Sequence, residues 1–346
     1  MIAIKRGPQA RISSYPNQYG RLTDAFGRVH HDLRVSLTDR CSLRCSYCLP
    51  AEGVPLAPSG TLLQADEIVR LVGIATTLGI NRVRLTGGEP LLRTDLVEIV
   101  AGITRLPIPP RLALTTNGIG LAQLAEPLAR AGLQRVNVSL DTLNRDHFIR
   151  LTRRDRLSDV LEGLAAAQAA GLAPIKLNAV LLPGVNDDDA VDLLDWAVER
   201  DFELRFIEQM PLDGGHTWRR DQMITAAQIL AKLGQTHRLT PLGGRGPAPA
   251  ARWLVDDGPA VVGVIAAVTE PFCGACERLR LTADGQLRYC LFAQTESDLR
   301  QHLRDGASDA DLAAIFRANV LNKWAGHAIG QADFTQPARP MSAIGG

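Results

Sequence analysis

One pattern repeats from about residue 33 to residue 210: a short run rich in β-branched residues is followed by a stretch with helical periodicity. The stretches DEIVRLVGIATTLG and LSDVLEGLAAAQAAG, for example, end at glycine, as helix C-termini often do. Strands that alternate with helices pair in parallel, so six such units predict an α/β fold, a partial (β/α)6 TIM-type barrel that falls short of the complete eight-unit form. A flat doubly wound sheet is the alternative. The predicted strands are Arg34–Leu37, Arg82–Thr86, Arg111–Thr115, Arg135–Ser139, Ile175–Val180 and Glu203–Glu208.

The composition changes after Met210. The Pro/Gly/Ala-rich segment 243–250 predicts a loop, and the strand-like runs RWLV and VVGVIAAV follow it. RLRLT and QLRYC, joined through Ala283-Asp284-Gly285, predict a β-hairpin, and helical stretches follow near 296–304 and 309–322. We therefore expect an N-terminal extension over 1–32, the barrel over 33–220, and a smaller C-terminal α+β domain over 221–346.

The overall charge excludes two classes of partner. The chain has 346 residues and a formal net charge of +1, so no global basic field attracts nucleic acid or an anionic membrane. The longest apolar run, residues 259–268, is half the length needed to span a bilayer. Lys5, Arg6 and Arg11 interrupt the region where a signal peptide would carry its apolar core. We expect a cytoplasmic protein with reduced thiols and no nucleic-acid or membrane partner.

All six cysteines fall into two triplets, Cys41, Cys45 and Cys48 in CSLRCSYC, and Cys273, Cys276 and Cys290. A [4Fe–4S] cluster normally takes four thiolates, so three leave one iron open to a ligand from outside the protein. A disulfide framework suits short secreted chains, which this chain is not. Two zinc sites are a further alternative, but structural zinc needs a fourth ligand, for which His30 or His31 could serve the first triplet.

Polar residues gather at the ends of the predicted strands, where (β/α) barrels carry their sites. Successive strand residues point to opposite faces, so Arg84 and Thr86 share the face opposite Val83 and Leu85. The apolar face must meet the helices, and the interior then carries Arg, Ser, Thr, Asn and Lys. Individually, such residues are often helix caps or turns. Together they predict a polar, solvent-accessible cavity that binds a polar, anionic ligand.

The motifs also match a known family. CSLRCSYC followed by LTGGEP resembles the radical SAM superfamily, whose members bind S-adenosylmethionine (SAM) at the open iron of a [4Fe–4S] cluster and generate a 5′-deoxyadenosyl radical. The segments DLRVSLTDRC, RLTGGEPLLR, LTTNG, VNVSLDTL, IKLNAVLLPGVND, RFIEQMP and CGACERLRLTADGQLRYCL resemble, in this order, the GTP 3′,8-cyclase family within it. The resemblance covers about residues 32–322.

This resemblance implies a role for each matching residue. Cys41, Cys45 and Cys48 would hold the SAM cluster, and Cys273, Cys276 and Cys290 a second [4Fe–4S] cluster that contacts guanine. The implied SAM contacts are Tyr47, Gly88, Ser139 and Met210. The implied GTP contacts are Arg34, Arg84, Thr115, Lys176, Arg278, Leu279 and Arg280. Arg278 and Arg280, together with a Gly345-Gly346 tail that reaches the active site, are the implied catalytic residues.

Charge chemistry agrees with a triphosphate ligand. The chain has no P-loop GxxxxGK[ST], so side chains must neutralise the phosphates. Arginine binds phosphate through charge-assisted, often bidentate hydrogen bonds. Position 82 carries Arg where some relatives are expected to carry Lys. A planar guanidinium binds phosphate through several N–H groups and an ammonium group binds it as a point charge, so the phosphate geometry could differ.

The implied reaction is the conversion of GTP to (8S)-3′,8-cyclo-7,8-dihydroguanosine 5′-triphosphate, the first step of molybdopterin (molybdenum cofactor) biosynthesis, through abstraction of the ribose 3′ hydrogen. The implied partners are GTP, an unidentified one-electron donor, a second copy in a homodimer, and the next enzyme of the pathway, which receives the product. Two other readings are a peptide-modifying radical SAM enzyme and a zinc-stabilised regulatory protein without turnover.

Overall fold

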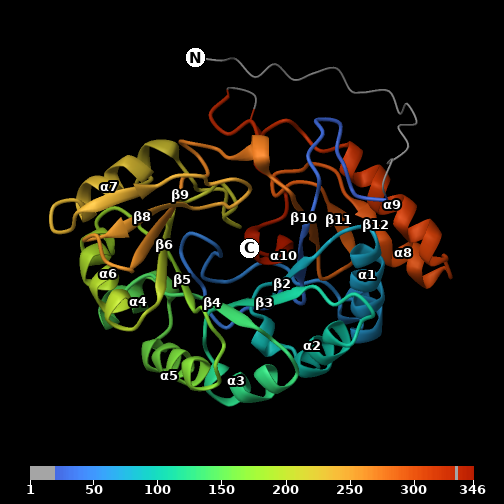
Figure 1. Cartoon of the computed structure of the whole chain (residues 1–346), viewed down its shortest axis with the longest axis horizontal. Coiled ribbons are helices and arrows are strands. Elements are labelled where there is room, and N and C mark those ends of the chain that lie inside the picture. Colours follow the sequence, from blue (N-terminus) through green and yellow to red (C-terminus); the bar gives the residue numbers. More distant parts are fainter. Residues whose placement is uncertain (1–19, 332–333) are drawn as a thin grey trace.

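The computed structural model describes residues 20–331 and 334–346, and its centre is a curved sheet with helices on the outer face (Figure 1). Six parallel strands form the barrel wall, and the six strand predictions are confirmed to within one residue at nearly every end. They are β1 Asp32–Ser36, β2 Arg82–Thr86, β3 Arg111–Thr116, β4 Arg135–Ser139, β5 Lys176–Val180 and β6 Glu203–Ile207. The intervening helices are α1 Ala65–Thr77, α2 Leu96–Thr104, α3 Leu121–Arg130, α4 Arg145–Thr152, α5 Leu157–Ala169 and α6 Ala190–Glu199.

The C-terminal region contributes both helices and strands. Its helices are α7 Ala226–Leu233, α8 Leu299–Arg304, α9 Asp309–Leu321 and α10 Met341–Ile344. Its strands are β7 Leu239–Leu242, β8 Ala251–Val255, β9 Val261–Ile265, β10 Arg278–Leu281, β11 Gln286–Arg288 and β12 Ser297–Asp298. The predicted loop at 243–250 and the hairpin between β10 and β11 are both present.

These later strands extend the barrel sheet at both of its edges. The strand order is β12-β11-β10-β1-β2-β3-β4-β5-β6-β9-β8-β7 in one 12-stranded sheet. β10 pairs in parallel with β1, and β9 pairs in parallel with β6, whereas the outermost strands are antiparallel. The extra strands satisfy edge groups that a six-stranded wall would leave unpaired. The partial barrel with an added C-terminal region is therefore confirmed, while the domain limits at 32 and 220 stay predictions.

Alternation along each strand separates the core from the cavity. Leu33, Val35, Val83 and Leu85 are buried in the main apolar core against the helices. The register places Arg34 beside Arg84 on one side and Arg280 on the other. This pairing brings three guanidinium groups from three strands onto the inner face of the sheet. No helix in the described ranges is long and apolar enough to cross a membrane.

Candidate active site

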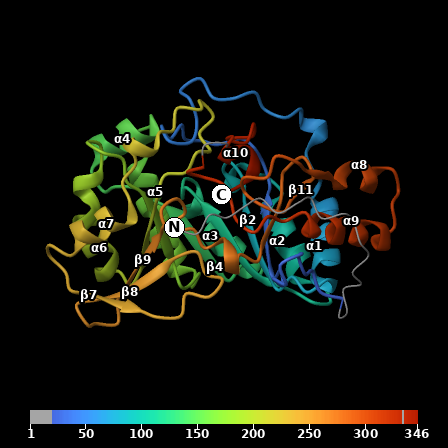
Figure 2. The ribbon, with the colours of Figure 1, turned by 90° about the horizontal axis from the view of Figure 1, so that it is seen from above.

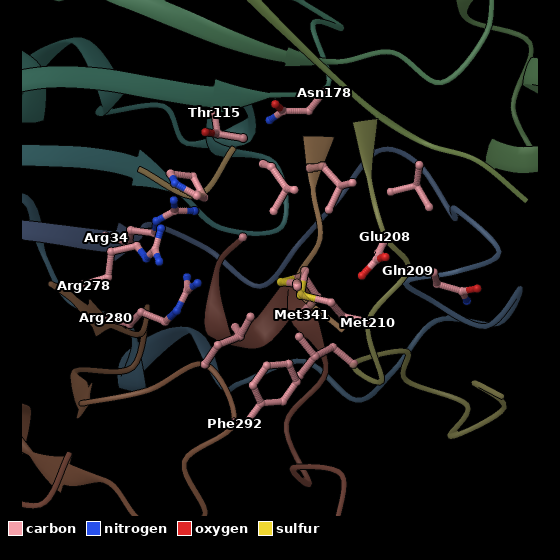
Figure 3. A pocket seen from close by; sticks show the side chains of 18 of the residues that line it. Arg34, Thr115, Asn178, Glu208, Gln209, Met210, Arg278, Arg280, Phe292 and Met341 are labelled. Carbon is pink, nitrogen blue, oxygen red and sulfur yellow. The ribbon is translucent and has the colours of Figure 1, made fainter. Parts of the chain in front are cut away.

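A cavity of about 270 Å³ opens inside the barrel, close to the lower limit for small-molecule sites. Arg34, Arg278 and Arg280 gather on one side of it, while Met210, Phe292 and Met341 lie together on another (Figure 3). The cavity thus has a cationic wall and an apolar wall. Further lining residues include Tyr47, Cys48, Arg84, Thr115, Ser139, Asp141, Arg205, Phe272, Cys273, Cys276, Cys290, Lys323 and Gly346.

The first cysteine triplet lies in the loop that follows β1. Cys41, Cys45 and Cys48 are half-buried free thiols, and the backbone N–H groups of Cys48 and Leu49 both donate to the Cys45 carbonyl at 2.9 Å. Burial raises the pKa of Cys48 to about 12, so a metal that binds there must displace its proton. The turn thus fixes Cys45 and Cys48 within one short segment of the loop.

The Gly87-Gly88 segment runs directly beneath this loop. Gly88 N–H donates to Thr38 O at 2.6 Å, and Glu89 N–H donates to Arg40 O at 2.7 Å. A Cβ atom at Gly88 would lie 2.2 Å from the Arg40 carbonyl oxygen, so only glycine fits. The motif after β2 therefore sets the position of the segment that leads into Cys41.

Glu89 connects the ends of β2 and β3. Its buried carboxylate accepts hydrogen bonds from Leu91 N–H at 2.9 Å, Thr116 Oγ1 at 2.7 Å and Asn117 N–H at 2.7 Å. Burial nevertheless raises its pKa to about 7. Asn117 in turn donates through Nδ2 to Ser42 Oγ at 3.0 Å, so the network reaches the cysteine loop.

Tyr47 and Asp141 form a second link across the barrel. The Tyr47 hydroxyl donates to Asp141 Oδ2 at 2.7 Å, and Asp141 Oδ1 accepts from Val180 N–H at 2.9 Å. Burial raises the pKa of Asp141 to about 6. The aromatic residue between two cysteines is thereby fixed against the ends of β4 and β5.

The second triplet lies at the β10–β11 hairpin and lines the same cavity. Cys273, Cys276 and Cys290 are half-buried free thiols, and Lys323 Nζ donates to Arg278 O at 2.8 Å and Tyr289 O at 2.6 Å. Burial would raise the pKa of Cys276, but the charges of Arg278 and Lys323 outweigh it and lower the pKa to about 6. This favours the thiolate, which is the metal-binding form.

The inner arginines repel one another in a buried setting. Burial lowers the pKa of Arg34 to about 10, and burial with the Arg34 charge lowers the pKa of Arg84 and of Arg280. Arg34 Nε is buried without a hydrogen-bond partner among the described residues. A polyanion in the cavity would relieve both the repulsion and the unsatisfied donor.

The C-terminal tail, residues 334–346, ends inside the barrel, where the mark C stands at the centre of Figure 1. Arg280 Nη1 donates to Gly345 O at 2.5 Å, and Thr86 Oγ1 donates to Gly346 O at 3.0 Å. Gly345 has φ +88°, and a Cβ there would lie 2.9 Å from Thr86 Cγ2. The double glycine thus reaches the cationic wall, and its catalytic role stays a prediction.

Curated relatives match this chain over nearly its whole length. A GTP 3′,8-cyclase of Streptomyces coelicolor is 61% identical over 328 residues, which cover 94% of this chain and 96% of the relative. A GTP 3′,8-cyclase of Rhodococcus opacus is 56% identical and covers 94% of this chain and 93% of its own length. The chain belongs to the GTP 3′,8-cyclase family.

Two family models and two solved structures also match this chain. Residues 35–197 match the Radical SAM superfamily, and residues 202–329 match Molybdenum Cofactor Synthesis C. The crystal structure of Streptococcus suis SuiB superposes with a TM-score of 0.59 at 16% identity, covering 91% of this chain and 77% of SuiB. The structure of SuiB bound to S-adenosylmethionine gives the same TM-score of 0.59 at 15% identity, with 90% and 77% covered. At such identity the likeness establishes the fold alone.

Not every predicted site residue lines the cavity. Lys176 Nζ contacts Glu203 Oε2 at 2.5 Å, and the Leu279 side chain is fully buried in the apolar core. Arg82 pairs with Glu277 instead of lining the cavity. Cys41, Cys45, Gly88 and Gly345 are not among the residues that line the cavity. Gly345 accepts a hydrogen bond from Arg280, which does line it.

Sequence reasoning missed several residues of this GTP 3′,8-cyclase site. Arg205 follows the same inward alternation as Glu203 on β6, so strand parity could have found it. The guanidinium groups of Arg245 and Arg278 lie 4.5 and 4.7 Å from the centroid of the Phe272 ring. Lys323 reaches the second triplet through its contacts with the Arg278 and Tyr289 carbonyls, and only its rarity in this lysine-poor chain marks it.

Proposed function

We propose that this chain converts GTP to (8S)-3′,8-cyclo-7,8-dihydroguanosine 5′-triphosphate, the first step of molybdenum cofactor biosynthesis. One observation carries the proposal: residues of both cysteine triplets and inward-facing arginines from β1, β2 and β10 line one cavity. Two metal centres and an anion-binding wall around one cavity suit a substrate with a base to be oriented and a triphosphate to be neutralised. Membership of the GTP 3′,8-cyclase family supports the same substrate.

The donor sets suit iron–sulfur clusters. No three His, Cys, Asp or Glu side chains converge tightly enough in the described ranges to hold a single metal ion, so the triplets are assessed by their chemistry. Each supplies three soft thiolate ligands, which favour an iron–sulfur cluster and leave one iron free. Cys41, Cys45 and Cys48 would hold the SAM cluster, and Cys273, Cys276 and Cys290 the second one. A cluster held by the first triplet would supply the one electron that cleaves bound SAM, and the resulting 5′-deoxyadenosyl radical would remove the ribose 3′ hydrogen.

The protein residues orient the reactants and exclude water. Tyr47, Gly88, Ser139 and Met210 would surround SAM, with Tyr47 held in place by its hydrogen bond to Asp141. Arg34, Arg84 and Thr115 would meet the triphosphate from the sheet, and Lys176 would add a further cation near β5. The apolar wall of Met210, Phe292 and Met341 would keep water from the reacting carbon.

Arg278 and Arg280 would hold GTP in the orientation needed for hydrogen abstraction. They are two residues apart at the start of β10, and Arg278 Nη2 lies 3.4 Å from Cys276 Sγ. Arg280 would also hold Gly345 near the substrate. Arg278→Ala and Arg280→Ala should therefore each lower both turnover and GTP affinity; unchanged values would refute these roles.

The decisive experiment is to ask whether GTP triggers SAM cleavage. Anaerobically reconstituted protein should contain roughly eight iron atoms with matching sulfide per chain, and GTP should stimulate 5′-deoxyadenosine release. Release with a peptide but not with GTP would indicate a peptide-modifying enzyme. Zinc without inorganic sulfide would indicate a zinc-stabilised regulatory protein without turnover. A homodimer and transfer of the product to the next enzyme of the pathway complete the proposal.

A further inference from the structure

Five arginines lie in the cysteine loop and at the C-terminal end of α4, and in the described ranges none of them pairs with a carboxylate. We call them the arginine patch: Arg40, Arg44, Arg150, Arg153 and Arg154. Neighbouring Arg145 and Arg156, by contrast, pair with Asp155 and Asp159. Glu52 is the exposed acidic residue within the same loop. The patch therefore concentrates positive charge locally in a chain whose net charge is only +1.

Backbone contacts join the loop and the end of α4 into one surface. Arg44 N–H donates to Thr152 O at 3.0 Å, and Ser46 N–H donates to Leu151 O at 2.8 Å. Arg153 Nη1 donates to Arg44 O at 2.6 Å, and Arg44 Nη1 donates to Cys41 O at 2.8 Å. The patch thus contacts the backbone that carries the cysteines. In Figure 2 the blue loop and α4 lie along the same side of the molecule.

Two exposed apolar side chains are carried by segments that contact the loop of Arg40. Leu56 and Leu92 are 49% and 48% exposed. Leu56 precedes Ala57, whose N–H donates to Asp39 Oδ2 at 2.6 Å, and Leu92 follows Glu89, whose N–H donates to Arg40 O at 2.7 Å. Both leucines therefore belong to segments that contact the Asp39-Arg40 stretch. Arginine combined with exposed apolar residues is typical of protein docking surfaces.

We propose that the arginine patch is the docking surface for an acidic protein that carries one electron at a time. The inference rests on the proposed function, because that chemistry requires one electron from outside the chain. The carrier loses one electron and the cluster held by Cys41, Cys45 and Cys48 gains it, with no bond made or broken. A protein carrier fits better than another polyanion because Arg44 and Arg153 contact the backbone of the cysteine loop, so a partner bound there would approach the cluster closely, as electron transfer requires. Charge complementarity would accelerate the encounter.

The test compares two double variants that remove the same charge. Arg150→Gln/Arg154→Gln removes two exposed arginines of the patch, and Arg105→Gln/Arg111→Gln removes two exposed arginines at the opposite end of the strands. Stopped-flow absorbance follows cluster reduction without GTP, using either reduced flavodoxin or dithionite as reductant. With flavodoxin at low ionic strength, the patch variant should be reduced roughly tenfold more slowly than wild type. The control variant should match wild type, and dithionite should reduce all three proteins equally.

Several outcomes would overturn the proposal. These are an unchanged rate with flavodoxin, an equal loss in the control variant, or a patch variant that is also slow with dithionite. Leu56→Ser provides a second variant at the apolar flank, and it should raise the flavodoxin concentration needed for half-maximal rate. A patch variant that changes only the oligomeric state would show a copy-to-copy interface instead. Because the assay contains no GTP, its result does not depend on whether the chain cyclises GTP.

Discussion

The C-terminal tail is held by Arg339 just before it enters the barrel. Arg339 Nη2 donates to Asp284 Oδ2 at 2.8 Å, Nη1 donates to Asp284 Oδ1 at 3.2 Å, and Nε donates to Glu296 Oε2 at 3.1 Å. Glu296 also pairs with the buried Arg288, two residues before Cys290. We expect Arg339→Gln to loosen the tail, because glutamine has no charge and cannot donate these hydrogen bonds to both carboxylates.

The size of the effect follows from burial and geometry. Hydrogen bonds to charged groups contribute about 1.5–3 kcal/mol when a partner is removed. The Arg339 side chain is 30% exposed, so solvent screening favours the low end of that range. A loss of about 1.4 kcal/mol corresponds to a factor of ten in an equilibrium constant. The tail should therefore open about tenfold more often in the variant.

Hydrogen–deuterium exchange of the C-terminal peptide measures this opening directly. The amides of Ala343, Ile344 and Gly345 donate to carbonyls at 3.0, 3.2 and 2.8 Å and should be protected in the wild type. Their exchange should accelerate about tenfold in Arg339→Gln. Arg156→Gln, which breaks the Arg156–Asp159 ion pair on α5, is the matched control and should leave the tail unchanged. Tail exchange at the wild-type rate in Arg339→Gln would refute the reasoning.

Three further predictions test individual residues. Gly345→Ala forces a side chain into a left-handed position beside Thr86, so 5′-deoxyadenosine formation should fall about tenfold with little change in melting temperature; unchanged turnover would contradict this. Burial and the Arg205 charge lower the pKa of Lys176 to about 8, so calorimetric GTP affinity should fall as pH rises through 8 and Lys176 loses its charge. Lys176→Arg should make GTP affinity less dependent on pH. The same pH dependence in the wild type and the variant would exclude a contact between Lys176 and phosphate. Cys276→Ser should remove roughly half of the bound iron and sulfide, and full retention would show that this thiol is not a ligand.

Strand prediction succeeded where alternation and burial agree. In β2 the apolar Val83 and Leu85 face the core while Arg84 faces the cavity, as period-two alternation requires. For Lys176 the sequence predicted a cation on the inner face but not its ion pair with Glu203, because alternation gives the face of a residue but not its partner. Glu203 lies on the adjacent strand in register with Lys176, and that pairing depends on strand order.

The sequence by itself determined the βα repeat, the two cysteine triplets and the inward polar face, because periodicity and ligand spacing are local properties of the chain. Only the tertiary structure decided that β10 joins β1 and β9 joins β6, which places Arg280 beside Arg34 and residues of both triplets around one cavity. The same holds for the tail and for Lys323, since their contacts join residues far apart in sequence. Such contacts arise from packing of the whole sheet, and no short stretch of sequence encodes them.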